Sequence, residues 1–130
     1  MRLPGLILCL LLTALPLQAG TMSAEEFDRY TKGRTLFYGQ GGQAYGVERY
    51  LPGRRVIWSF LDGKCQDGHW YEKAGLICFV YEETPDPQCW RFSRGPAGLI
   101  AEFADGRAAA LYEAEDTGRE MVCRGPETGV

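Results

Sequence analysis

Apolar and polar side chains alternate residue by residue through the centre of the chain, a pattern typical of extended strands. Neighbouring side chains of a strand point to opposite faces. One face of residues 76–82 would therefore carry Ile77, Phe79 and Tyr81, and the other would carry Leu76, Cys78 and Val80. The alternation resumes at residues 89–92, after the breaker run Thr84–Pro87, whose two prolines cannot donate to a β-ladder. The pattern predicts a β-hairpin.

The register of this hairpin is fixed by two requirements that agree. If Cys78 lies opposite Cys89, then Ile77 lies opposite Trp90. One register would thus serve both a disulfide and an aromatic-to-aliphatic cross-strand pair. Half of the aromatic residues and three of the five cysteines fall between residues 58 and 92, so we expect the centre of the molecule to form there.

From Arg34 onward the chain shows no helical period, and turn signals arrive about every ten residues. Strands are predicted at residues 35–38, 44–51, 55–61, 69–73, 76–82, 89–92, 99–104 and 108–115, and a brief segment at 121–123 follows. Asp105-Gly106 would form the turn of the last hairpin. About eight short antiparallel strands favour an up-and-down meander that closes into a small or partly open barrel. A two-sheet sandwich is the alternative.

A short helix is predicted before the first strand. Ser23 can cap it and Glu26 can complete a capping box, while Met22 can pack on Phe27 as a hydrophobic staple. Gly33 can adopt the left-handed conformation that ends the helix.

Residues 1–19 have the form of a cleaved secretory signal: Arg2, then an apolar run from Leu6 to Leu17, then the small residue Ala19. A membrane anchor needs about 20 uninterrupted apolar residues, so we expect no membrane span after cleavage. Residues 20–130 would form a single domain, periplasmic or secreted. Cys9 would leave with the signal.

The four remaining cysteines, Cys65, Cys78, Cys89 and Cys123, predict a disulfide framework, because an even count is typical of small exported domains. We expect Cys78 to pair with Cys89 across the hairpin and Cys65 to pair with Cys123. The competing interpretation is a four-thiolate zinc site. Its ligands would lack the close Cys-x2-Cys pairs that such sites use, so no metal is predicted.

The net charge of the chain limits the classes of partner that we expect. The formal net charge is −3, and it becomes one unit more negative when Arg2 leaves. Nucleic acids and anionic membranes select for clustered Lys and Arg, and the chain has no basic run. We expect neither as a partner.

The sequence presents no catalytic constellation, and we expect a non-catalytic domain without a cofactor. The run Gly39–Ala44 matches a dinucleotide-binding pattern, but the segment after it looks like a strand and not like the helix that would hold phosphate. His69 is the only histidine. A triad of His69 with Ser59 or Ser93 would lack the nucleophile-elbow pattern.

Two kinds of binding remain. The wide aromatic side chains of Trp58, Trp70, Tyr71 and Trp90 could line a pocket for a small apolar or aromatic ligand, or they could simply fill the core.

The alternative is an inhibitor-like module that docks on an envelope protein. Its anchor would be the exposed loop Glu83–Pro87, with Glu83, Thr84 and Asp86 as contact residues, because the two prolines would pre-order the loop.

Four short motifs carry a resemblance to known proteins: Gly33–Leu36, Gly68–Tyr71, Leu76–Phe79 and Gln88–Trp90. In these motifs the chain resembles a group of small exported bacterial proteins of unknown function, over roughly residues 24 to 92. The resemblance implies a lipocalin-like meander with paired cysteines and implies no activity. The pair Cys65 and Cys123 departs from the shortest form of the group's pattern.

Overall fold

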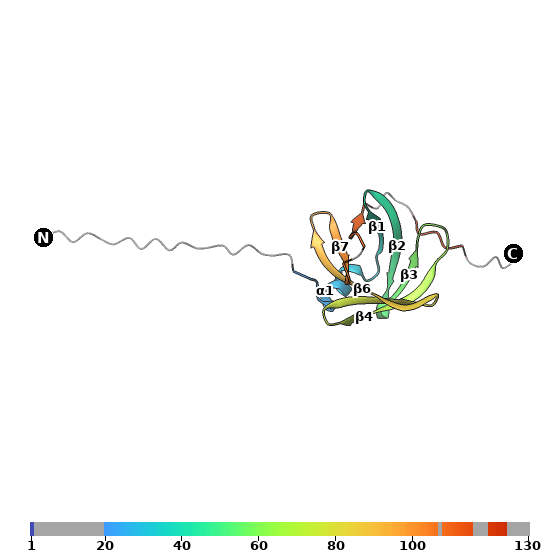
Figure 1. Ribbon diagram of the computed structural model, residues 1–130, viewed down its shortest axis with the longest axis horizontal. Helices are drawn as coiled ribbons and strands as arrows, with labels where there is room; N and C mark the ends of the chain where they lie inside the picture. Colours follow the sequence, from blue (N-terminus) through green and yellow to red (C-terminus); the bar gives the residue numbers. More distant parts are fainter. Residues whose placement is uncertain (2–19, 107, 116–119, 125–130) are drawn as a thin grey trace.

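The fold is a closed barrel of antiparallel strands, seen in a computed structural model that describes Met1 and residues 20–106, 108–115 and 120–124. Eight strands follow one another around the barrel in chain order, and the last pairs with the first (Figure 1). They are β1 (Thr35–Gln40), β2 (Gln43–Leu51), β3 (Arg55–Ser59), β4 (Gln66–Lys73), β5 (Leu76–Tyr81), β6 (Thr84–Gly95), β7 (Gly98–Phe103) and β8 (Leu111–Ala114). The prediction of an eight-stranded barrel is confirmed, and the sandwich alternative is wrong.

The predicted β5–β6 hairpin has the predicted register. Cys78 lies opposite Cys89 and Ile77 opposite Trp90. Ile77, Phe79 and Tyr81 point into the main core, whereas Cys78 lies on the outer face and is covered by its bridge to Cys89. Both predicted disulfides are present.

The helix α1 (Ala24–Thr31) closes one end of the barrel and lies at the lower left of it in Figure 1. Ser23 caps the helix, because its hydroxyl accepts a hydrogen bond from the Glu26 amide at 3.1 Å. Phe27 is fully buried and makes edge-on contacts with Tyr50 and Trp70, at centroid distances of 5.7 and 5.1 Å. The helix therefore plugs the barrel with one aromatic ring.

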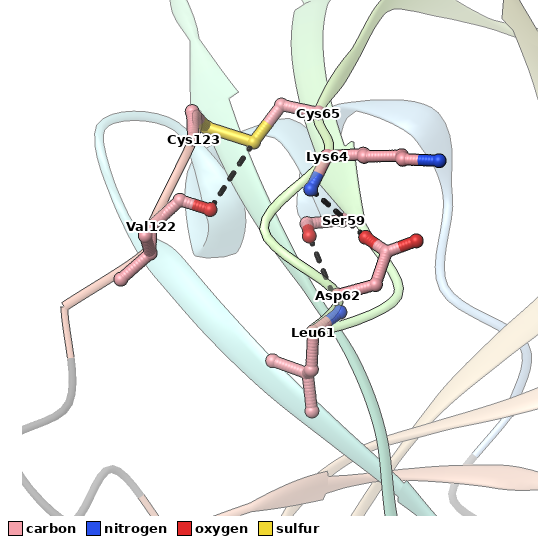
Figure 2. Close-up of a disulfide and its surroundings, with 7 residues drawn as sticks. All are labelled: Ser59, Leu61, Asp62, Lys64, Cys65, Val122 and Cys123. Carbon is pink, nitrogen blue, oxygen red and sulfur yellow. Dashed lines mark hydrogen bonds between the residues drawn. A yellow bond between two sulfur atoms is a disulfide. The ribbon is translucent and has the colours of Figure 1, made fainter. Parts of the chain in front are cut away.

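A second, smaller core lies outside the barrel. Met121 packs on Phe37 and Val47, which face outward from β1 and β2. The segment that carries Met121 is held by the Cys65–Cys123 bridge and by the Arg124 amide, which donates to the Gly63 carbonyl at 2.6 Å. Figure 2 shows this bridge beside the loop that contains Leu61, Asp62 and Lys64.

Two turn predictions are wrong. Thr84–Pro87 is not a loop, since β6 begins at Thr84 and the turn falls at Glu82 and Glu83. Asp105-Gly106 does not form a tight two-residue hairpin, because β7 ends at Phe103 and β8 begins only at Leu111.

Two disulfides indicate an oxidising environment outside the cytoplasm. Apart from Met1, the predicted signal of residues 1–19 lies outside the described residues. Within the residues that the structure describes, no helix has the length and apolar character needed to cross a membrane.

Candidate functional site

A cavity of about 210 Å³ occupies the barrel at the end opposite α1. Its mouth is formed by side chains from three strands, β2, β4 and β6, and from the residue after β3: Tyr45, Phe60, Gln66, Thr84 and Gln88. Its floor includes Tyr50, Phe79 and Phe92, and all three of these rings contact Phe27 of α1. The barrel is thus closed at one end by the helix and open at the other.

Aromatic rings make most of the cavity wall. Trp58 lies 5.9 Å from Tyr45 and 5.3 Å from Phe60 between ring centroids, so the three rings form one cluster at the mouth. Phe60 is half exposed. Trp90, on the opposite part of the wall, packs edge-on against Phe103 at 4.8 Å.

Gly46 is what allows Trp58 to lie flat against β2. A β-carbon built on Gly46 would come within 2.3 Å of the Cη2 atom of Trp58. Any larger residue would displace the indole from this position, since real β-carbons do not approach other atoms so closely.

Among the described residues of the cavity wall, only Glu48 carries a carboxyl group. Glu48 lies on β2 directly across the ladder from Trp58, and it is 2 % exposed. The Tyr81 hydroxyl donates a hydrogen bond to Glu48 Oε1 at 2.8 Å. Glu48 Oε2 has no hydrogen-bond partner within the described part of the chain. Glu48 therefore places, in the wall of an aromatic cavity, a buried carboxyl oxygen that has no donor among the described residues.

Burial raises the pKa of Glu48 well above that of an exposed glutamate, and the hydrogen bond from Tyr81 offsets only part of this effect. The side chain consequently keeps its proton over a wider pH range.

The tyrosines around Glu48 stay neutral. The hydroxyls of Tyr38 and Tyr50 lie 2.7 Å apart in a buried pair. Burial raises the pKa of both groups, and it also raises the pKa of Tyr81. None of the described lining residues is a Lys, an Arg or a His, so an anionic ligand would find no positive partner in the wall.

Of the four aromatic residues predicted to form a pocket, the structure brings together two. Trp58 and Trp90 line the cavity. Trp70 instead packs on Phe27 at the closed end, where the Arg54 guanidinium lies 4.4 Å from the centroid of a Trp70 ring. Tyr71 pairs with Cys78 on the outer face, because neighbouring strand residues point to opposite sides.

The predicted docking residues are exposed but belong to different elements. Glu83 lies in the β5–β6 turn, whereas Thr84 and Asp86 lie in β6. The Thr84 hydroxyl donates to Gln66 Oε1 at 3.0 Å, which ties β6 to β4 at the cavity mouth. The run Gly39–Ala44 spans the end of β1, the turn at Gly41 and Gly42 and the start of β2, so no helix follows it.

Sequence reasoning missed Glu48, Tyr45 and Phe60. One signal was available: Glu48 and Tyr50 stand two residues apart in a predicted strand and so share a face. The sequence does not say which face points inward, because Val47 on the other face is also buried.

Comparisons of the chain with family models, with curated proteins and with solved structures found no match in any of the three. The resemblance to small exported bacterial proteins therefore stays a prediction from the four motifs.

Proposed function

We propose that this protein is a non-catalytic, periplasmic or secreted barrel that binds a small organic ligand in its cavity. The observation that carries the proposal is the aromatic cavity of about 210 Å³, which is open at one end and floored by the rings that pack on Phe27. Aromatic walls with few polar groups are typical of small-molecule sites. The carboxyl group of Glu48, which lies in this wall, would orient the ligand.

The intrinsic fluorescence of the protein provides a test. Trp58 and Trp90 line the cavity whereas Trp70 does not, so a bound ligand should change the emission of the first two. We expect a panel of neutral, cationic and anionic aromatic and aliphatic molecules to contain binders that shift the emission. The shift should persist in Trp70→Phe.

A cavity-filling variant supplies the control. Ala101 is buried in the cavity wall, and Ala101→Phe should fill part of the space and abolish the response. Ala97→Phe adds the same group at an exposed turn and should leave the response unchanged. No emission change with any member of the panel, or an equal response in Ala101→Phe, would reject the cavity as a ligand site.

The alternative function, docking on an envelope protein, is favoured by one observation. Residues 82–87 are all exposed in a continuous stretch beside the cavity mouth. If this stretch is the anchor, Thr84→Ala combined with Asp86→Ala should abolish partner recovery from a periplasmic extract while thermal stability stays nearly constant. Pro96→Ala, at another exposed turn, is the control. Equal recovery by both proteins would eliminate the docking hypothesis for this stretch.

A further inference from the structure

We infer that the ligand is a compact organic cation, an amine or quaternary ammonium, held between the Glu48 carboxylate and the aromatic rings at the cavity mouth. This inference rests on the proposed function and names its ligand class. Three properties of the cavity support it.

The first property is the unsatisfied carboxyl oxygen. Glu48 Oε2 is buried and, within the described residues, unpartnered, while Oε1 is already held by Tyr81. A buried polar atom without a partner destabilises a folded protein. A positively charged group at Oε2 would remove this penalty, and the fixed Oε1 would keep the carboxyl group oriented.

The second property is the aromatic enclosure. Tyr45, Trp58 and Phe60 stand within 5.9 Å of one another at the mouth, between ring centroids. The faces of such rings carry negative charge density, and clusters of this kind are a general means of binding ammonium groups. Phe60 is half exposed at the entrance, where an incoming cation would meet it before Glu48.

The third property is the charge of the wall. Among the described lining residues, the titratable groups are Glu48 and the tyrosines Tyr38, Tyr45, Tyr50 and Tyr81. None of the described lining residues carries a positive charge that could neutralise an ionised Glu48, so that role falls to the ligand. In the free protein burial raises the pKa of Glu48 and so favours its neutral form. Binding of a cation would expel the Glu48 proton to solvent and leave a carboxylate–ammonium pair.

The test uses two probes of the same shape and different charge: choline and 3,3-dimethylbutan-1-ol, its neutral carbon isostere. We expect the wild-type protein to bind choline at least about tenfold more tightly than the alcohol. Glu48→Gln, an isosteric neutral change, should abolish this preference. Glu102→Gln, the same change at an exposed position of β7, should retain it.

A second measurement does not depend on any variant being folded. Calorimetric titration of the wild-type protein with choline, in two buffers of different ionisation enthalpy, should show release of up to one proton per ligand at about pH 5. The affinity should rise with pH, by up to about tenfold per unit, until the pKa of Glu48 in the free protein is reached.

The outcomes separate the two proposals. Equal binding of choline and the alcohol overturns the cationic ligand and leaves the cavity a site for neutral molecules. Choline preference retained in Glu48→Gln, or choline binding without proton release, overturns the inference at its other part, because the cation would then not be held by the Glu48 carboxylate. Failure of the protein to bind either probe would also overturn the inference of a cationic ligand. If no molecule of the fluorescence panel changes the emission, the proposed ligand site itself is rejected.

Discussion

At the scale of single residues, Glu48 is the least expected side chain in the barrel. Burying an ionised carboxylate without a positive partner is unfavourable by several kcal/mol, so such a group usually keeps its proton. The surrounding tyrosines provide one hydrogen bond, from Tyr81, and no positive charge. We therefore expect Glu48 to lower the stability of the folded protein at neutral pH, as is typical of residues retained for function.

The pH dependence of stability follows from this burial. The pKa of Glu48 in the folded state lies above its ordinary value of 4.5, so the folded protein holds a proton that the unfolded chain loses. The stability contributed by this proton is fully present below the ordinary pKa of 4.5, and it is lost as the pH rises through the pKa of Glu48 in the folded state. Relative to Glu48→Gln, the wild-type free energy of unfolding should fall by up to about 1.4 kcal/mol per pH unit above pH 5. Urea denaturation of both proteins at several pH values measures this, and parallel curves would contradict it.

Gly46 permits a prediction of packing. Because a β-carbon there would clash with the Trp58 indole, Gly46→Ala should destabilise the fold by about 1–3 kcal/mol and shift the tryptophan emission. Gly20→Ala, at a glycine with open space around it, is the control. Denaturant titration followed by fluorescence reports both effects. If Gly46→Ala behaves like the control, then Trp58 does not lie against β2.

At the scale of elements, the two ends of the barrel are built differently. The closed end depends on α1, whose Phe27 fills the space between β2, β4 and β6. The open end depends on Phe60, which stands in the loop after β3, and Cys65 of the Cys65–Cys123 bridge ends the same loop. The same type of residue therefore stabilises the fold at one end and shapes the entrance at the other.

This contrast gives a matched pair of variants. Phe27→Ala removes a fully buried ring and should lower the free energy of unfolding by about 3–5 kcal/mol. Phe60→Ala removes a half-exposed ring and should lower it by less than about 1 kcal/mol, while weakening the ligand response at the mouth. Chemical denaturation and the fluorescence titration separate the two. Equal losses of stability would show that the helix does not plug the barrel.

The hairpin shows how far local pattern determines an element. Alternation and the two cysteines were enough to predict the β5–β6 register, because a shift of one residue would turn every apolar side chain outward. The prolines led to the wrong boundary. β6 continues through Pro85 and Pro87 because the ladder is irregular there: Phe79 pairs with Gln88 and Tyr81 with Thr84. The extra β6 residues need no ladder donor, so proline is tolerated.

The cavity could not be predicted in the same way. Whether Glu48 or Val47 faces inward depends on barrel closure and on Met121, which arrives from far along the chain to cover Val47. Likewise, Trp70 looked equivalent to Trp58 and Trp90, but the helix occupies its end of the barrel. The sequence indicated that large aromatic residues meet in the interior, whereas the position of the open space is a property of the assembled fold.

At the scale of the whole molecule, the two disulfides constrain different parts of the chain. The Cys78–Cys89 bridge spans 11 residues within one hairpin, and the Cys65–Cys123 bridge spans 58 residues and fastens the C-terminal segment to the loop at the mouth. The chain-entropy model assigns roughly 3 kcal/mol to the short loop and about 4 kcal/mol to the long one. Small domains have a total stability of about 5–15 kcal/mol, so the bridges together are comparable with the whole.

Replacing each pair of cysteines by serine should therefore have unequal consequences. Cys78→Ser with Cys89→Ser should lower the free energy of unfolding by roughly 3 kcal/mol and leave the ligand response intact, because that bridge lies on the outer face, away from the cavity. Cys65→Ser with Cys123→Ser should lower it by about 4 kcal/mol and also weaken the response, because the loop that carries Phe60 loses its covalent tether. Urea denaturation and the fluorescence titration measure the two effects on the same samples. A variant without the Cys65–Cys123 bridge that binds as well as wild type would show that the strands alone hold the mouth in shape, and that this bridge serves only stability in an oxidising compartment.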